Sequence, residues 1–114
     1  MRAVITGATS GIGKAMACQL AQNGWSLVLT GRNQTVLEQL QKNLPTAVEI
    51  LPLDLAEEEA PYQLFDFCKK KRVDLLVNNA GFGIFGRFTE TNLQEEMDLL
   101  AVNVRALHIL TKLF

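Results

Sequence analysis

Short runs of branched apolar residues alternate with longer helical patterns, and this alternation limits the fold of the chain most. The runs predict strands at residues 2–6, 26–30, 47–51 and 73–78. Each run is almost continuously apolar, which is typical of strands that are covered on both faces. A strand–helix series of this kind predicts an α/β fold in which a doubly wound parallel sheet lies between two layers of helices, a three-layer α-β-α arrangement.

Four helices are predicted between and after these strands. The first ends at Asn23-Gly24, the second ends before Pro45, and the third begins near Pro61. The fourth is expected to begin at a capping box formed by Thr91 and Gln94 and to continue to the last residue. The apolar residues that share one face in each helix are Ile12, Ala15, Met16 and Leu20, then Val36, Leu37, Leu40 and Leu44, then Leu64, Phe65 and Cys68, and finally Leu93, Met97, Leu100, Val104 and Leu107.

The composition fits a folded chain and argues against several classes of partner. Of the 114 residues, 48% are apolar and 20% are charged, which supplies enough apolar material for a core. A formal net charge of −1 argues against nucleic acid bound through a basic surface. No apolar run approaches the about 18 residues of a membrane-spanning helix, and two cysteines with one histidine do not make a typical zinc site. We therefore expect a cytoplasmic chain with no nucleic-acid, membrane or metal partner.

A glycine-rich segment joins the first predicted strand to the first predicted helix. Residues 6–13 are Thr-Gly-Ala-Thr-Ser-Gly-Ile-Gly. Phosphate binding at a helix N-terminus needs outward-pointing N–H groups and no obstructing side chains, and glycine meets both needs. We expect Gly7 to form the turn, Gly11 to allow the close approach of a phosphate, and Gly13 to let the helix contact the strand. The spacing is neither that of a P-loop nor that of the GxGxxG fingerprint.

Four separated motifs resemble those of the short-chain dehydrogenase/reductase family. They are TGxxxGxG at 6–13, Asp54-Leu55 after the third strand, Asn-Asn-Ala-Gly at 78–81, and Ala-Val-Asn-Val at 101–104. The resemblance covers the whole chain and implies a Rossmann-like dinucleotide-binding domain over residues 1–114, truncated relative to the family and incomplete at its C-terminal side. The residues expected to bind the cofactor are Gly7, Thr9, Ser10, Gly11, Ile12, Gly13, Arg32, Asn33, Asp54, Leu55, Asn79, Ala80 and Gly81.

The end of the second strand indicates which nicotinamide cofactor is preferred. In a doubly wound fold this position faces the adenosine ribose, where an acidic residue would bind the ribose hydroxyls of NAD. The segment 29–33 is Leu-Thr-Gly-Arg-Asn and contains no carboxylate. Arg32 is suited to a fork-like ion pair with a 2′-phosphate, although it is alternatively an ordinary surface arginine. We therefore expect NADP(H) in preference to NAD.

The resemblance also implies hydride transfer between NADP(H) and an alcohol or carbonyl substrate, with Asn103 as a catalytic residue. In the family, the backbone of this asparagine helps to order a water of the proton relay, and a serine and a Tyr-xxx-Lys pair complete the site. The only tyrosine here is Tyr62, which we interpret as a packing residue, and the residue four positions later is Asp66. His108 is interpreted as a helix-face or interface residue. The chain alone is therefore expected to be inactive.

Three functions remain open from the sequence. The chain is the cofactor-binding part of an NADP(H)-dependent oxidoreductase, or a non-catalytic nucleotide-binding sensor or regulatory module, or an inactive truncation. The segment 82–86 is predicted to be an apolar loop that either borders a hydrophobic substrate or covers the core. The fourth strand is expected to be an exposed apolar edge, and such edges pair readily with another chain. We therefore expect a homo-oligomer, formed through this edge or through the long last helix.

Overall fold

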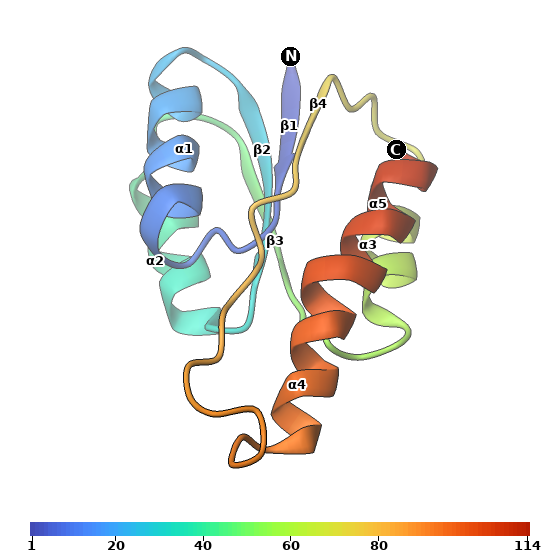
Figure 1. Cartoon of the computed structure of the whole chain (residues 1–114). Coiled ribbons are helices and arrows are strands. Elements are labelled where there is room, and N and C mark those ends of the chain that lie inside the picture. Colours follow the sequence, from blue (N-terminus) through green and yellow to red (C-terminus); the bar gives the residue numbers. More distant parts are fainter.

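The computed structural model describes all residues from 1 to 114 and alternates strands with helices as the sequence predicts (Figure 1). The sheet contains four parallel strands in the order β3-β2-β1-β4. The strands are β1 Arg2–Ile5, β2 Ser26–Gly31, β3 Val48–Pro52 and β4 Leu75–Val77. The helices are α1 Gly11–Gln22, α2 Gln34–Asn43, α3 Ala60–Cys68, α4 Leu93–Leu100, the π-helix η1 Ala101–Ala106, and α5 Leu107–Leu113.

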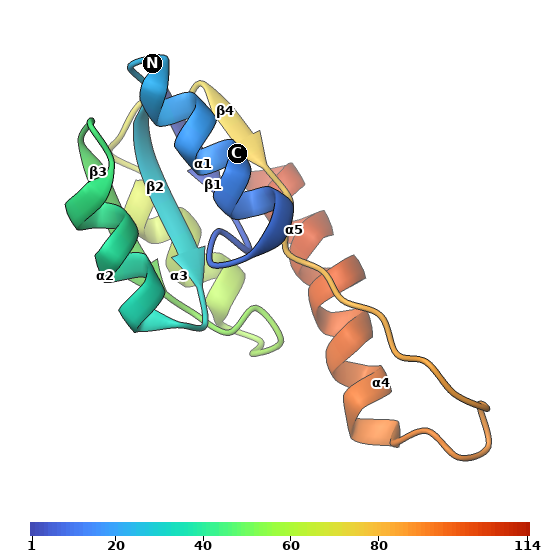
Figure 2. The same ribbon diagram turned by 90° about the vertical axis from the view of Figure 1, so that its left-hand side faces the viewer.

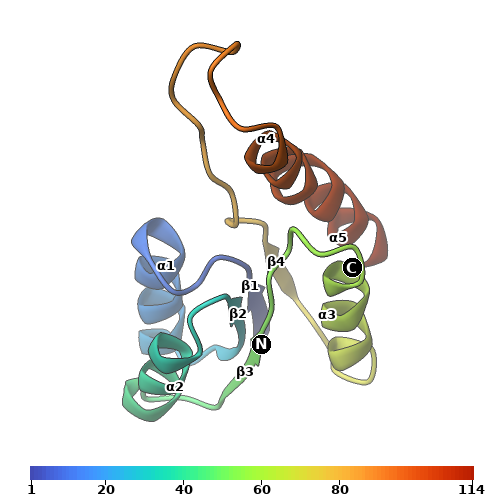
Figure 3. The ribbon, with the colours of Figure 1, turned by 90° about the horizontal axis from the view of Figure 1, so that it is seen from below.

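The helices lie in two layers, one on each side of the sheet. Helices α1 and α2 cover one face, and α3 and α5 cover the other (Figure 3). Alternate residues of β1 point into the two cores: Ala3 and Ile5 pack in the cluster under α1 and α2, and Val4 packs in the cluster under α3 and α5. The predicted α/β fold, Rossmann-like and three-layered, is confirmed.

The strand order reverses between β1 and β4, and this reversal decides where a ligand can bind. From β1 the chain moves outward to β2 and β3, and it then returns to place β4 on the other side of β1. In open α/β sheets, ligands bind at the carboxyl ends of the strands at such a switch point. The predicted strand at 73–78 is shortened to three residues, which pair with β1 only, so its outer edge is free.

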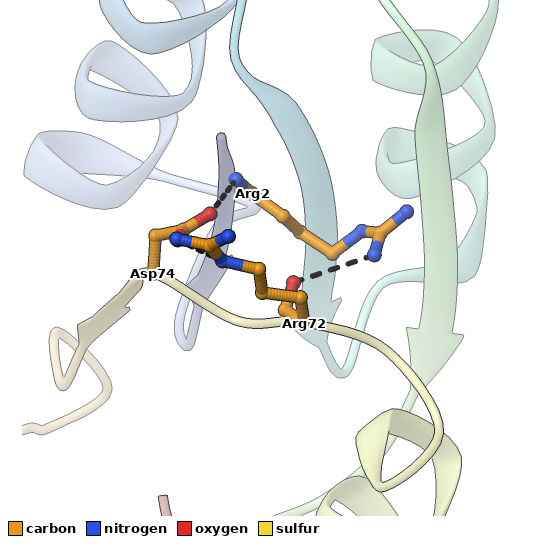
Figure 4. Close-up of polar contacts among 3 residues, drawn as sticks. All are labelled: Arg2, Arg72 and Asp74. Atoms are coloured by element: carbon orange, nitrogen blue, oxygen red, sulfur yellow. Dashed lines mark hydrogen bonds and ion pairs between the residues drawn. The ribbon is translucent and has the colours of Figure 1, made fainter.

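The start of β1 is attached to the segment before β4 by Asp74 (Figure 4). The backbone N–H of Arg2 donates to Oδ2 of Asp74 at 2.9 Å, and Nε of Arg72 donates to Oδ1 at 2.9 Å. The N–H of Arg2, and secondarily the Arg72 guanidinium, hold the pKa of the Asp74 carboxyl below its usual value. These contacts lie at the amino ends of the strands, away from the switch point.

Two predicted helix faces are wrong, and both errors have a physical reason. In α1 the buried residues are Gly13, Ala17 and Ala21, while Ile12 is 72% exposed, because small residues let the helix lie close to the sheet. In the last helical segment, the predicted apolar repeat lies on the solvent side. The residues buried there instead are Ala101, Val102, Ala106 and Leu110.

Two smaller predictions also need correction. The N-cap of α4 is Asn92, whose side chain accepts from the N–H of Glu95, so the capping box expected at Thr91 and Gln94 is not formed. Thr91 instead donates its hydroxyl to the Glu96 carboxylate. Tyr62 is 45% exposed and is therefore not the packing residue that the sequence suggested.

The segment 78–92 and helix α4 extend away from the sheet as an arm (Figure 2). The segment contains no helix or strand, and it exposes Phe85 and Phe88. Helix α4 runs back from its tip and continues through η1 into α5, which packs on α3. No helix of the chain has the length and apolar character that crossing a bilayer requires.

Candidate functional site

A pocket of about 470 Å³ lies at the carboxyl ends of the strands, at the β1–β4 switch point. Its walls come from the loops after all four strands and from one face of α4 and η1. This volume is within the range of small-molecule and cofactor sites. The lining residues are Gly7, Thr9, Ser10, Gly11, Ile12, Thr30, Gly31, Arg32, Leu53, Asp54, Leu55, Ala56, Asn79, Ala80, Gly81, Phe82, Asp98 and Val102.

The glycine-rich loop presents the N-terminus of α1 to this pocket. Gly7 and Gly11 have φ values of +62° and +55°, which an L side chain adopts only with strain. Ser10 is the N-cap residue, but its side chain makes no cap hydrogen bond. The first N–H groups of a helix have no intrahelical acceptor. Those of α1 are therefore left to an anion at the positive end of the helix dipole.

Gly13 lets α1 pack directly on the loops that form the pocket floor. A Cβ atom at this position would lie 2.3 Å from Nδ2 of Asn79 and 2.3 Å from the carbonyl oxygen of Gly7. Both distances are far inside van der Waals contact. Any side chain at residue 13 would therefore push the helix away from β1. This agrees with the interpretation of Gly13 as the residue that lets the helix contact the strand.

A buried hydroxyl joins β1 to the loop after β4. Thr6, 1% exposed, accepts the backbone N–H groups of Asn79 at 3.1 Å and Ala80 at 2.9 Å, and it donates to the carbonyl of Val77. The side-chain amide of Asn79 donates to the carbonyls of Thr6 and Gly7. The amide group of Asn79 thus holds the glycine loop in place from within the protein.

The loop after β3 forms the far end of the pocket. Oδ1 of Asp54 accepts the N–H of Ala56 at 3.0 Å, which leaves Oδ2 without a hydrogen-bond partner in the chain. Arg105 of η1 donates to the carbonyl of Ala56 at 2.9 Å and fixes the loop against the helix. Leu55 and Val102 belong to the same apolar cluster and give this end of the pocket an apolar surface.

The loop after β2 brings Arg32 to the pocket but not Asn33. Arg32 is exposed, lines the pocket and makes no side-chain hydrogen bond or ion pair, so its guanidinium is free for a ligand. The side chain of Asn33 instead caps α2 by accepting the N–H of Val36 at 3.1 Å. A Cβ at Gly31 would lie 2.6 Å from Cγ2 of Thr9, so the two loops are in contact here.

Asn103 lies in η1, the only π-helical segment of the chain, and both ends of its amide are occupied. Its Oδ1 accepts the N–H of Phe82 at 3.0 Å, and its Nδ2 donates to the carbonyl of Phe82 at 2.7 Å. A Cβ at Gly81 would lie 3.2 Å from Oδ1, closer than most Cβ contacts, so the loop lies tightly against the amide. The side chain of Asn103 therefore holds the loop after β4. Its place in a π-helical turn also fits a functional role, since such turns often occur at functional sites.

Replacing Asn103 tests this two-point contact. Asn103→Ala removes both hydrogen bonds and is expected to destabilise the chain by about 1–2 kcal/mol and to raise the amide exchange rate of residues 82–91. Asn103→Asp keeps the acceptor for the Phe82 N–H but faces its carbonyl with a carboxylate, so we expect a loss at least as large. Unchanged exchange in this segment, measured by hydrogen–deuterium exchange mass spectrometry, would contradict the role.

The structure brings most predicted site residues together and adds others. Every residue predicted to bind the cofactor lines the pocket except Gly13, which packs behind it, and Asn33, which caps α2. His108 is exposed on α5, as predicted. The lining residues that were not among those predicted to bind the cofactor are Thr30, Gly31, Leu53, Ala56, Phe82, Asp98 and Val102. Most of them flank predicted motifs, and Asp98 shares a helix face with Val102, four residues later.

Comparison with known proteins decides the family. The family model described as short chain dehydrogenase matches residues 1–114. The chain belongs to the short-chain dehydrogenase family. It is 33% identical to an uncharacterized oxidoreductase of Staphylococcus epidermidis, over 95% of this chain and 48% of that protein. This chain thus spans about half the length of the curated relatives that it matches.

Solved structures of short-chain dehydrogenases have the same fold as this chain. One, from a metagenomic source and in complex with NADP, matches with a TM-score of 0.91 at 33% identity and covers 100% of this chain and 54% of its own. Another, from Sphingobium yanoikuyae and in complex with NADPH, matches with a TM-score of 0.89 at 31% identity, over 97% of this chain and 46% of its own.

Proposed function

We propose that this chain binds NADP(H) in the pocket at the β1–β4 switch point and forms the cofactor-binding part of an oxidoreductase. The observation that carries the proposal is the uncapped N-terminus of α1, which opens into the pocket beside two glycines with positive φ. Two structural neighbours are complexes with NADP or NADPH, which supports a nicotinamide dinucleotide as the ligand.

The residues present fit this cofactor. A Cβ at Gly11 would meet nothing within 4 Å, so there is open space in front of the helix terminus, where the diphosphate would lie. The N–H groups of Gly11, Ile12 and Gly13 are the donors that we propose for it. The apolar surface of Leu55 and Val102 suits the adenine base, and Asn79, Ala80 and Gly81 border the path toward the nicotinamide end.

Arg32 is proposed to select NADP(H) through the 2′-phosphate. It lines the pocket beside Gly31, and its guanidinium has no intramolecular partner. Arg32→Ala is expected to weaken NADPH binding about tenfold to 150-fold while changing NADH binding less than threefold, since a charge-assisted hydrogen-bond pair contributes about 1.5–3 kcal/mol. The measurement is a titration that follows the fluorescence of the bound nicotinamide.

The same titration distinguishes the proposal from its alternatives. Lys42→Ala is the matched control, because Lys42 is an exposed cation in the last turn of α2 outside the pocket lining and should leave both affinities unchanged. Absence of NADPH binding to the wild-type chain would contradict the proposed function. If Arg32→Ala weakens NADPH and NADH binding equally, the chain still binds a dinucleotide, but Arg32 does not recognise the 2′-phosphate.

The proposed reaction is hydride transfer between NADP(H) and a small alcohol or carbonyl compound. When bound, the nicotinamide supplies or accepts the hydride. Asn103 holds the loop at Phe82 beside the pocket, and we propose that its own backbone carbonyl, in the widened π-helical turn, orients the relay water. No tyrosine or lysine lines the pocket, so we expect the 114-residue chain to bind the cofactor without turnover.

We also propose that the chain self-associates through the solvent side of α4, η1 and α5. Large apolar side chains lie exposed there, and exposed apolar patches of this kind mark association surfaces. Met97→Glu with Val104→Glu is expected to shift the light-scattering mass at high concentration toward that of one chain. A wild-type chain that remains a monomer would contradict the proposal. The exposed residues of this face are Leu93, Met97, Leu100, Val104 and Leu107.

A further inference from the structure

The π-helix η1 is hydrogen-bonded to two different loops of the pocket. Asn103 bonds both the N–H and the carbonyl of Phe82, in the loop after β4. Two positions later, Arg105 donates from Nη2 to the carbonyl of Ala56, in the loop after β3, at 2.9 Å. Side chains two positions apart in a helix do not face the same way. Asn103 and Arg105 therefore reach the two loops from different sides of η1.

Arg105 is the main polar attachment of the loop after β3. Residues 54–56 all line the pocket. Apart from bonds between near neighbours in the sequence, Arg105 supplies the only hydrogen bond that these three residues make within the chain. Leu55 also packs in the same apolar cluster as Val102 of η1. The loop after β3 is thus attached to η1 by one polar and one apolar contact.

The helix between the two loops is itself held firmly in place. Three of its six residues, Ala101, Val102 and Ala106, are buried. It continues α4 at one end and leads into α5 at the other. When two mobile segments are attached to one rigid element, ordering one of them lowers the entropy that ordering the other must cost. This arrangement can therefore link the two loops without a large movement of the backbone.

We infer that Arg105 couples the two ends of the pocket, an inference that rests on the proposed function. The adenosine end of the cofactor restricts residues 54–56, and Arg105 passes this restriction to η1 through the carbonyl of Ala56. Asn103 passes it on to Phe82, so the loop toward the nicotinamide end becomes more ordered. Arg105 does not line the pocket itself and is therefore a positioning residue.

The test uses adenosine 2′,5′-bisphosphate, which carries the adenosine end of NADPH but no nicotinamide. The readout is the hydrogen exchange of the Phe82 N–H, measured by NMR, because this group is protected by its bond to Oδ1 of Asn103. In the wild type, saturating bisphosphate is expected to slow this exchange about fivefold, the lower limit of the usual coupling between two sites.

Variants of Arg105 separate coupling from direct contact with the ligand. In Arg105→Ala, saturating bisphosphate should change the Phe82 exchange rate by less than about 1.5-fold, because the link to η1 is lost. A ligand that shielded Phe82 by contact would slow the exchange equally in both proteins. Arg105→Lys keeps a charged donor for the Ala56 carbonyl and should recover most of the slowing. Lys112→Ala is the control, since Lys112 is an exposed cation on α5 outside the pocket, and it should behave as the wild type.

The outcomes distinguish this inference from the proposed function. Equal slowing in the wild type and in Arg105→Ala would overturn the inference alone. The same holds if the wild type binds the bisphosphate with no change in the exchange of Phe82. A wild-type chain that binds neither the bisphosphate nor NADPH would overturn the proposed function and this inference with it.

Discussion

Gly13→Ala is expected to destabilise the chain by about 3 kcal/mol and to abolish NADPH binding, although alanine is the better helix former. Helix propensity alone would favour alanine by about 1 kcal/mol. The added Cβ, however, would lie 2.3 Å from both the carbonyl oxygen of Gly7 and Nδ2 of Asn79. Backbone atoms cannot rotate away, so α1 must move outward and break the floor of the pocket. Urea unfolding and NADPH titration measure the two effects.

Gly24→Ala is the matched control for Gly13→Ala. Gly24 has a φ of +80°, but a Cβ added there would meet nothing within 4 Å, and it lies at the far end of α1. The backbone strain alone should cost about 1–2 kcal/mol and leave NADPH affinity unchanged. If Gly13→Ala is as stable as the wild type and still binds NADPH, the pocket does not require the close packing of α1 at residue 13.

Thr6→Val has the second largest expected effect, a loss of about 3 kcal/mol at almost unchanged side-chain volume. Valine keeps the shape of threonine but cannot accept the N–H groups of Asn79 and Ala80. Each buried donor that loses its acceptor costs about 1–3 kcal/mol. The loop after β4 is then no longer attached to β1, so cofactor affinity should fall with stability. Thermal and urea unfolding, together with NADPH titration, measure both losses.

Two threonine variants separate the hydroxyl from the methyl group. Thr6→Ser keeps the hydroxyl and should recover most of the stability and the NADPH affinity. Thr30→Val also removes a buried hydroxyl, but that hydroxyl only donates, to the carbonyl of Leu51 at 2.7 Å, so the expected loss is smaller. If Thr6→Val loses no more stability than Thr30→Val, the hydrogen bonds from the N–H groups of Asn79 and Ala80 to Thr6 do not contribute to the stability of the chain.

The positions of the strands and the location of the pocket could be predicted from the sequence because they depend on local signals. Branched apolar runs mark strands, glycine and proline mark helix ends, and the carboxyl ends of parallel strands meet at one edge. Gly7, Gly11 and Asp54 therefore appear in the pocket as a consequence of where their strands end. The two-point contact of Asn103 with Phe82 joins residues 21 positions apart and leaves no local signal.

The buried faces of α1 and of the last helix could not be predicted, because small residues pack closely and carry little hydrophobic signal. In α1, alanines and Gly13 face the sheet while the larger Ile12 points into the pocket. In the last helix, the regular apolar repeat lies on the solvent side, and the π-helical turn changes the angular spacing that an α-helical pattern assumes. The N-cap at Asn92 lies one residue after the predicted position, a difference that is common at helix ends because they fray.

A crystal structure of the chain with NADPH tests most directly whether the N-terminus of α1 binds the diphosphate of a dinucleotide. We expect diphosphate oxygens within hydrogen-bond distance of the backbone N–H groups at residues 11–13, with the guanidinium of Arg32 on the 2′-phosphate. NADPH bound elsewhere, or a glycine loop closed over the helix terminus with no ligand in saturating NADPH, would contradict it.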